Sequence, residues 1–192
     1  AEISSRITAN GICRKVEFHD SVNSTNNRAK LLAESGAEEG TLIVAEEQTA
    51  GKGRRGRGWE SEPGVGIWMS LLLRPMLSTD QVSGLTLVTA LAIAKAIKKV
   101  TKADVKIKWP NDILLNGKKI CGILLESVVS DKLECLVIGF GINVNTKKFP
   151  DDLKNKATSL LLETNHSYNI KELAEKIYSQ FTFDYEDYKK GK

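Results

Sequence analysis

The sequence of 192 residues has few of the side chains that build disulfide frameworks or zinc sites. It contains three cysteines, Cys13, Cys121 and Cys135, without a Cys-x-x-Cys pair, and two histidines, His19 and His166. An odd, widely spaced set of cysteines is more typical of small buried side chains in a reducing compartment than of cross-links. We therefore expect no metal ligated by protein side chains, and a histidine-based catalytic triad is poorly supported.

Long apolar runs are also missing. The most hydrophobic stretch, residues 85–100, contains Thr89, Lys95, Lys98 and Lys99, and no run reaches the roughly 20 apolar residues that cross a bilayer. The start of the chain shows no signal-peptide pattern. We therefore expect a cytoplasmic protein without a membrane partner.

What the sequence does have is the composition of a globular protein, with 41% hydrophobic and 27% charged residues, 15 glycines and only 4 prolines. A chain of this length can bury about 70% of its unfolded surface, so a single domain is the expectation. The net charge of +4 says little about partners by itself. Its distribution says more, because four cations cluster within residues 52–57 among interleaved glycines.

Apolar periodicity predicts both strands and helices. Strands are expected at residues 15–22, 41–46, 66–73, 105–109, 113–115, 120–126 and 133–144, and helices from about 23–27 to 36, at 80–100 and at 170–183. Asn116-Gly117 is a preferred pair for a type I′ hairpin turn, so the strands on either side of it should be antiparallel. The pattern predicts an α+β fold in which helices cover a mixed β-sheet.

The clearest chemical signal is EEQTAGKGRRGRGW at residues 46–59. Its glycines allow backbone conformations that turn amide groups toward an anion, while Lys52, Arg54, Arg55 and Arg57 supply positive charge. The segment matches neither a Walker A loop nor G-x-G-x-x-G. It favours a phosphate-bearing ligand, although a solvated basic loop or contact with a nucleic-acid backbone would use the same residues.

Three further segments place ligand-binding residue types at strand ends or turns: KWPND (108–112), KKICGILLE (118–126) and GFGINVN (139–145). Taken singly, the first could be an ordinary strand end with surface charges, and the last a flat or bulged strand. Because all three lie at strand ends or turns, they could converge with the basic loop on one face of the sheet.

The order of these segments, preceded by Ser24-Thr25-Asn26 and Gln48, resembles the catalytic domain of biotin protein ligases, particularly the bacterial bifunctional ligase/repressor type. The resemblance runs from about residue 19 to residue 145. It implies the biotin/lipoate ligase catalytic fold, which is similar to that of class II aminoacyl-tRNA synthetases. It also implies an ATP-dependent reaction that forms biotinyl-5′-AMP and transfers biotin to a lysine of a carrier protein.

The resemblance also implies roles for individual residues. The biotin-binding residues would be Ser24, Thr25, Asn26, Gln48, Gly51, Lys52, Gly53, Arg54, Lys119, Gly122 and Leu124. The ATP-binding residues would be Arg54, Arg55, Arg57, Trp59 and Asn143. The catalytic residues would be Lys119, Arg54, Lys108 and Asp112, and Mg²⁺ would accompany ATP.

The implied partners are biotin, ATP and a biotin carboxyl carrier protein domain of acetyl-CoA carboxylase or a similar enzyme. The oligomeric state, monomer or homodimer, stays open. Members of the family usually carry a small C-terminal β domain, and the repressors carry an N-terminal helix-turn-helix for which residues 1–18 are too few. We therefore expect residues 1–192 to be the catalytic domain alone, with nucleic acid bound only through a domain outside this sequence.

The sequence departs from the usual family loop at one position, where Lys52 replaces an arginine. Two alternative functions stay open. A lipoate protein ligase or transferase has the same fold and related chemistry, and a nucleic-acid-binding module could use the basic loop. The motifs GKGRRGRGW and KWPND fit biotin better than lipoate, and a net charge of only +4 counts against the nucleic-acid module.

Overall fold

The computed structural model describes residues 12–129 and 133–192, so the expectation for residues 1–18 falls largely outside the described part. The strands are β1 (Lys15–Val22), β2 (Thr41–Gln48), β3 (Gly66–Leu73), β4 (Lys106–Lys108), β5 (Asp112–Leu115), β6 (Lys118–Val129) and β7 (Leu133–Asn143). The helices are α2 (Thr25–Glu34), α3 (Thr79–Thr101), α4 (Leu160–Thr164) and α5 (Ile170–Lys189), and a short 3-10 turn spans Arg54–Gly56.

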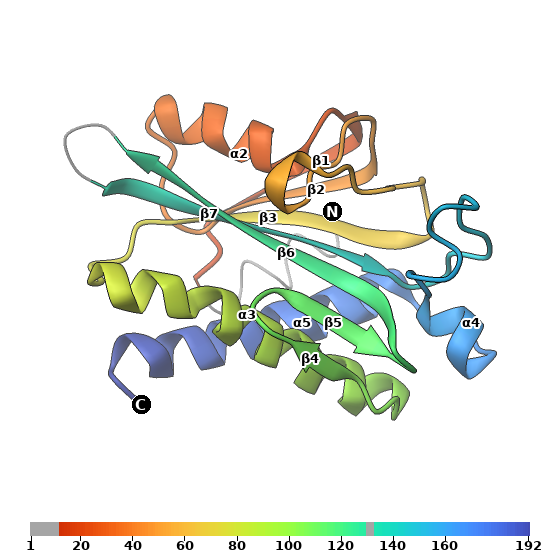
Figure 1. Ribbon diagram of the computed structural model, residues 1–192. Coiled ribbons are helices and arrows are strands. Elements are labelled where there is room, and N and C mark those ends of the chain that lie inside the picture. Colours follow the sequence, from red (N-terminus) through yellow and green to blue (C-terminus); the bar gives the residue numbers. More distant parts are fainter. Residues whose placement is uncertain (1–11, 130–132) are drawn as a thin grey trace.

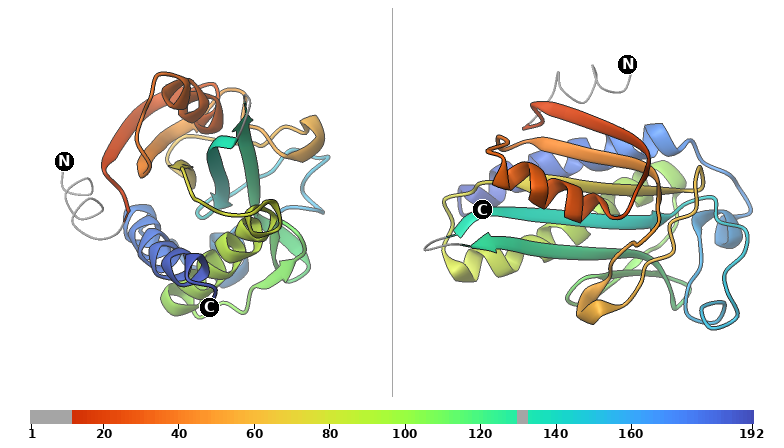
Figure 2. Two further views of the ribbon diagram at one scale, coloured as in Figure 1. Left: turned by 90° about the vertical axis from the view of Figure 1, so that its left-hand side faces the viewer. Right: turned by 90° about the horizontal axis from the view of Figure 1, so that it is seen from above.

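The described strands form one seven-stranded sheet in the order β1-β2-β3-β7-β6-β5-β4. Strands β1 and β2 are parallel, and the other neighbours are antiparallel. Helix α2 covers one face of this sheet, while α3 and α5 cover the other (Figures 1 and 2). The prediction of a mixed sheet covered by helices is confirmed.

Strand β3 lies in the middle of these layers and is buried along its whole length. Because side chains alternate between the faces of a strand, Met69 and Leu71 join the main core with α3 and α5, while Ser70 faces α2. A strand buried on both faces carries a nearly continuous apolar run. Ser70 is the polar exception in GIWMSLLL, and it reappears below in the functional site.

Helix α3 is long and apolar enough to cross a bilayer by length and composition alone. In the structure, however, Leu85, Ile93 and Ile97 are fully buried in the main core, and the helix packs against α5. A complete capping box at Ser78 begins the helix, and lysines near its C-terminus complement its dipole. Packing inside this fold therefore accounts for the apolar character of α3.

The predicted ends of strands and helices agree best with the structure where a turn requires particular residues. Asn116 and Gly117 have φ of 51° and 80°, as a type I′ turn requires, so the predicted hairpin of β5 and β6 is confirmed. Helix α5 runs past the predicted end at residue 183 because Tyr185 is fully buried and the Tyr188 hydroxyl donates to the Gln81 carbonyl, 2.7 Å away. The short helix α4 was not predicted.

Strand β2 continues two residues beyond its predicted end. Its last residues stay paired with β1, where Ser21 lies opposite Glu47 and Val22 opposite Gln48. This extension places the Gln48 side chain beside the first turn of α2, which begins three residues after β1 ends. The parallel β1-β2 pair thus brings two of the predicted biotin-binding segments together.

Candidate functional site

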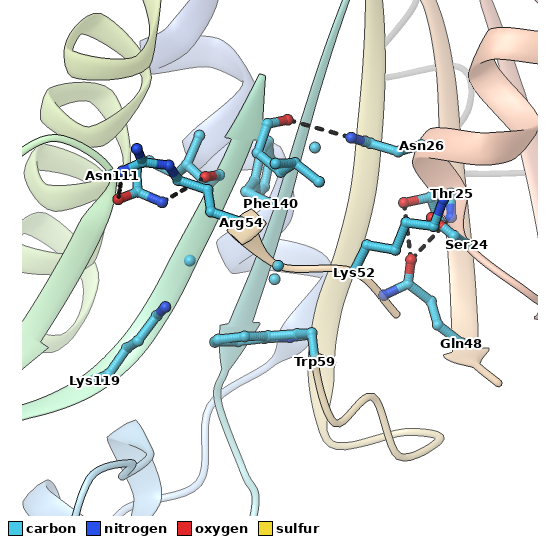
Figure 3. A pocket seen from close by; sticks show the side chains of 16 residues that line it. Ser24, Thr25, Asn26, Gln48, Lys52, Arg54, Trp59, Asn111, Lys119 and Phe140 are labelled. Carbon is cyan, nitrogen blue, oxygen red and sulfur yellow. Dashed lines mark hydrogen bonds between the residues drawn. The ribbon is translucent and has the colours of Figure 1, made fainter. Parts of the chain in front are cut away.

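A pocket of about 440 Å³, including space open to solvent, lies on the α2 side of the sheet. Its walls come from the start of α2, the loop after β2, and strands β6 and β7 (Figure 3). The lining residues are Ser24, Thr25, Asn26, Gln48, Lys52, Gly53, Arg54, Trp59, Asn111, Lys119, Gly122, Ile123, Leu124, Gly139, Phe140 and Gly141. Segments that are distant in sequence thus converge on one site.

One end of the pocket is lined mainly by hydroxyl and amide groups. Ser24 caps α2, since its hydroxyl accepts from the Asn27 amide. The amide and the hydroxyl of Thr25 both donate to Gln48 Oε1, at 2.9 and 3.2 Å, and Gln48 Nε2 donates to Ser61 Oγ at 2.9 Å. These bonds fix the orientation of the Gln48 amide, so this end offers a preorganised set of hydroxyl and amide groups to a ligand.

Behind this polar end, Ser70 joins the first turn of α2 to the sheet. Its fully buried hydroxyl lies 2.7 Å from Thr25 Oγ1 and 2.5 Å from Asn26 Oδ1, and its one proton can be donated to either oxygen. Asn26 Nδ2 in turn donates to the Leu124 carbonyl at 3.3 Å and to Glu126 Oε1 at 3.0 Å. The Asn26 amide is therefore held from both sides, and its orientation follows from its partners.

Glu126, which accepts a hydrogen bond from Asn26, is kept ionised. Burial raises the pKa of the Glu126 carboxyl, but hydrogen bonds from Lys30 and Asn26 outweigh that effect and hold the pKa below its ordinary value. Lys30 Nζ lies 2.9 Å from Glu126 Oε2. A carboxylate can only accept, so it keeps the Nδ2 group of Asn26 turned toward itself.

We predict that Ser70→Ala loosens this polar end. The change removes a buried donor that faces two acceptors, which should lower the free energy of unfolding by about 1–2 kcal/mol. Urea denaturation measures this loss, and calorimetry with biotin should show weaker binding. Thr89→Ala is the control, because the buried Thr89 hydroxyl bonds only within α3, to the Leu85 carbonyl. Equal effects of the two variants on biotin affinity would contradict the role assigned to Ser70.

The opposite end of the pocket is cationic. Lys119 Nζ lies 2.9 Å from Asp112 Oδ1 and 5.2 Å from the centroid of the Trp59 ring. Arg54 Nη1 donates to Asn111 Oδ1 at 3.1 Å. Two positive groups from separate segments therefore face the same end of the pocket (Figure 3). Such a pair can hold a carboxylate and a phosphate near each other.

Backbone hydrogen bonds fix Lys119 and Asn111 in place. The Lys119 amide donates to the Lys156 carbonyl, and the Thr158 amide donates to the Lys119 carbonyl, both at 2.9 Å. The Asn111 side chain donates to the Ile123 carbonyl at 3.1 Å, and the Ile123 amide donates to the Asn111 carbonyl at 3.0 Å. Lys119 therefore belongs to β6, and Asn111, in the turn before β5, is hydrogen-bonded to the same strand, whereas Arg54 is carried by a loop.

A pair of glycines makes room for an indole between the two ends. Gly122 of β6 and Gly141 of β7 lie opposite each other in register. A Cβ at Gly141 would lie 2.2 Å from Trp59 Nε1, and one at Gly122 would lie 3.2 Å from Trp59 Cζ3. At position 141 only glycine leaves space for the Trp59 ring, and at position 122 a larger residue would crowd the ring and Lys119.

The basic loop forms a short hairpin over the pocket. The Trp59 amide donates to the Gly51 carbonyl at 2.9 Å, and the Gly53 amide donates to the Arg57 carbonyl at 2.7 Å. Arg55, at the tip, has φ of 58°. Arg55 and Arg57 are exposed and do not line the pocket.

Most of the predicted biotin-binding residues meet in the pocket. The structure brings together Ser24, Thr25, Asn26, Gln48, Lys52, Gly53, Arg54, Lys119, Gly122 and Leu124, and it adds Trp59 from the predicted ATP-binding residues. The predicted residues that do not line it are Gly51, Arg55, Arg57, Lys108, Asp112 and Asn143.

Arg55 and Arg57 are exposed on the loop, and local structure explains why the other four residues lie outside the lining. Gly51 is buried under the loop, where a Cβ would lie 2.4 Å from the Trp59 carbonyl oxygen. Lys108 is exposed on β4, at the edge of the sheet, and Asp112 reaches the pocket only through Lys119. Asn143 donates to the Thr158 carbonyl at 3.2 Å and lines a smaller neighbouring pocket.

Sequence reasoning missed several lining residues. Asn111, Ile123, Gly139, Phe140 and Gly141 lie inside motifs that were recognised, but their roles were assigned to neighbours in those motifs. Ser70 lies outside all of the motifs. The signal that could have found it is a single hydroxyl in an otherwise apolar strand, because a buried polar group needs partners.

Comparisons with known protein families and with individual proteins agree with the resemblance seen in the sequence motifs. The family model "Biotin/lipoate A/B protein ligase family" matches residues 18–143. The bifunctional ligase/repressor BirA of Bacillus subtilis is 44% identical over 174 residues, which are 89% of this chain and 54% of that protein. A biotin--[acetyl-CoA-carboxylase] ligase of Mycobacterium tuberculosis is 37% identical over 153 residues, 77% of this chain and 55% of the relative. The chain thus spans about half the length of these curated relatives.

Solved structures show the same likeness. The biotin protein ligase of Aquifex aeolicus, in a complex with biotin and ATP, superposes with a TM-score of 0.80 at 33% identity. The match covers 92% of this chain and 72% of the Aquifex chain. The biotin protein ligase of Leishmania major, in a complex with biotinyl-5-AMP, gives a TM-score of 0.74 at 29% identity, with 90% and 75% of the two chains covered.

Proposed function

Because the chain belongs to the biotin/lipoate A/B protein ligase family, we propose that it is a biotin protein ligase that uses ATP to attach biotin to a lysine of a carrier protein. The observation that carries the proposal is one pocket with hydroxyl and amide groups at one end and the cations Lys119 and Arg54 at the other. The relatives support it, since the bacterial ones compared above are named as ligases and the Aquifex protein holds biotin and ATP.

The polar end suits the head group of biotin, whose ureido edge both donates and accepts hydrogen bonds. Thr25 and Gln48 hold each other in fixed orientations there, and Asn26 is fixed by Ser70 and Glu126. Leu124 adds an apolar wall. This combination of apolar surface and a few placed polar groups is typical of small-molecule sites.

The cationic end suits the activation step. A carboxylate oxygen of biotin attacks the α-phosphorus of ATP, the bond to pyrophosphate breaks, and biotinyl-5′-AMP forms. Two anions must approach each other, so preorganised cations lower the barrier. Lys119 and Arg54 occupy the positions to do so. In the second step the carrier lysine attacks the biotinyl carbonyl carbon, and AMP leaves.

The nucleotide would lie beyond this cationic end, with Trp59 against the adenine. The assignments of Arg55, Arg57 and Asn143 to ATP, of Lys108 to catalysis and of Gly51 to biotin stay predictions, since these residues lie outside the pocket lining. Asp112 would act on the reaction through Lys119.

Mg²⁺ is part of the proposal as the companion of ATP. Within residues 12–129 and 133–192, no group of three metal-ligating side chains occurs. Mg²⁺ commonly binds through one or two carboxylates together with substrate phosphates and water. Asp112 is already paired with Lys119 and lies outside the pocket lining, so the phosphates and water would hold most of the ion's coordination sites. The ion would supply further positive charge to the phosphates.

The partners and the location complete the proposal. The acceptor would be a biotin carboxyl carrier domain of acetyl-CoA carboxylase or a similar enzyme, and the ligase would act in the cytoplasm, alone or as a homodimer. All three cysteines are buried free thiols, as expected in a reducing compartment. Burial raises the pKa of the Cys121 thiol, which keeps it protonated and unreactive next to the pocket.

Mass spectrometry tests the function directly. The chain is mixed with biotin, MgATP and a carrier domain, and the carrier should gain the mass of one biotinyl group. Calorimetry with biotin and lipoate separates the two ligase types, because binding of lipoate without binding of biotin would overturn the assignment. Steeply salt-dependent binding of duplex DNA by this chain would favour the nucleic-acid alternative instead.

Arg54→Ala should release the intermediate early. Arg54 carries a positive charge to the mouth of the pocket, and the loss of a charge-assisted contact to the adenylate should speed its release by about tenfold or more. Rapid filtration of enzyme with radiolabelled biotinyl-5′-AMP measures the rate. Arg55→Ala, which removes an exposed neighbour, should have a smaller effect. Equal retention by wild type and Arg54→Ala would contradict this role.

A further inference from the structure

The loop of residues 51–59 is held to both walls of the pocket by side chains. On one side, Lys52 Nζ donates to Asn27 Oδ1 of α2 at 2.9 Å. On the other side, Arg54 Nη1 donates to Asn111 Oδ1 at 3.1 Å. Figure 3 shows the Lys52 side chain reaching from the loop toward Ser24 and Thr25, and Arg54 lying beside Asn111. The loop thus crosses the mouth of the pocket as a strap with two attachments.

The two attachments differ in what else their acceptors do. Asn111 lines the pocket and is bonded to β6, so a change there would disturb the site itself. Asn27 does not line the pocket. It lies in the first turn of α2, where its amide donates to Ser24 Oγ at 3.4 Å, and its side-chain oxygen accepts from Lys52. Asn27 can therefore act on a bound ligand only through its neighbours.

The chemistry of the contact suits a lysine. The ammonium group of Lys52 is a compact point charge, and one amide oxygen satisfies one of its donors. An arginine would present a planar fork that a single amide oxygen cannot match in the same way. Lys52 thus departs from the usual family loop at the position whose side chain contacts Asn27.

We propose that Asn27 is a positioning residue that ties Lys52 to α2 and so keeps the loop closed over the pocket. Closure excludes water and slows the escape of what is bound beneath the loop. The ligand in question, biotinyl-5′-AMP, rests on the function proposed above. The tether itself does not, because it is a contact between two side chains of this chain.

Limited proteolysis of the ligand-free chain tests the tether. The loop carries Arg54, Arg55 and Arg57, so trypsin cuts there when the loop opens, and mass spectrometry distinguishes these cuts from others. Asn27→Ala removes an exposed polar contact and should speed loop cleavage by about two- to fivefold. Asn27→Asp keeps the acceptor and adds an opposite charge, so its cleavage should be no faster than that of the wild type. Leu31→Ala, one turn further along α2 and 57% exposed, is the control.

The second readout is the release rate of biotinyl-5′-AMP from the same variants. Asn27→Ala should release it about two- to fivefold faster, and Asn27→Asp should restore wild-type retention. Both variants should melt within a few degrees of the wild type, because an aspartate at this position of the first turn favours the helix dipole and alanine favours helix.

The outcomes decide between mechanisms. Wild-type cleavage and release in Asn27→Ala would overturn the proposal. The proposal would also be overturned if Asn27→Asp released biotinyl-5′-AMP as fast as Asn27→Ala or faster. That result would mean that retention depends on the free positive charge of Lys52, which an aspartate neutralises, and not on the hydrogen bond that holds the loop. If the wild-type chain forms no biotinyl-5′-AMP, the proposed function fails, while the cleavage series still supports or overturns the tether.

Discussion

Replacing Lys119 by alanine should lower the rate of biotinyl-5′-AMP formation by about 10²–10³-fold while changing biotin affinity by much less. Lys119 lies at the cationic end of the pocket, beside Asp112 and away from the groups that would bind the biotin head. Its charge matters most when negative charge develops between the carboxylate and the phosphate. Interactions that strengthen in the transition state affect turnover more than ground-state binding.

Single-turnover release of pyrophosphate measures the activation step, and calorimetry measures biotin binding. Lys118→Ala is the matched control, because Lys118 is adjacent in sequence but its Nζ reaches the Lys154 carbonyl, outside the pocket. Lys119→Arg keeps the charge and avoids leaving Asp112 without its partner, so it should recover part of the rate. Pyrophosphate release near the wild-type rate in Lys119→Ala would refute the role.

Gly139→Ala should impair both folding and biotin binding. A Cβ at Gly139 would lie 2.0 Å from Asn26 Oδ1, so the Asn26 side chain would have to leave its place between Ser70 and Glu126. Overpacking of this kind costs about 1–3 kcal/mol of stability, and the displaced amide would be lost to the ligand. Biotin affinity should fall by tenfold or more, since about 1.4 kcal/mol corresponds to a factor of ten.

A double-mutant cycle identifies the cause. If the collision with Asn26 is responsible, adding Gly139→Ala to an Asn26→Ala background should cost little further stability, because the colliding amide is gone. Urea denaturation of the four proteins gives the coupling free energy. Additive losses would show that the alanine at position 139 disturbs something other than Asn26.

The sequence predicted the architecture well where local chemistry is decisive. The apolar run of β3, the helical periodicity of α3 and the Asn116-Gly117 turn each specify one local structure. The family resemblance was confirmed, and it located most of the pocket because its motifs are short and continuous. These predictions needed no knowledge of long-range contacts.

What the sequence could not provide depends on pairings between distant residues. Ser70 matters because β3 passes beneath the first turn of α2, more than 40 positions earlier in the chain. The side chain of Asn143 turns to Thr158, on the following segment, and Asp112 turns to Lys119. A motif names the residues in a segment, but only the register of the sheet and the helix packing decide which of them face the ligand.

Lys119 and Arg54 are anchored differently, and this difference has a consequence for how the protein ages. Lys119 lies in β6 and is also held by main-chain bonds to residues 156–158, whereas Arg54 lies in an exposed loop. A molecule nicked within that loop keeps the charge that promotes activation and loses the cover that retains the product. If the chain has the proposed ligase function, ageing preparations should therefore release free biotinyl-5′-AMP, a mixed anhydride that reacts with lysine amines, instead of passing biotin to the carrier.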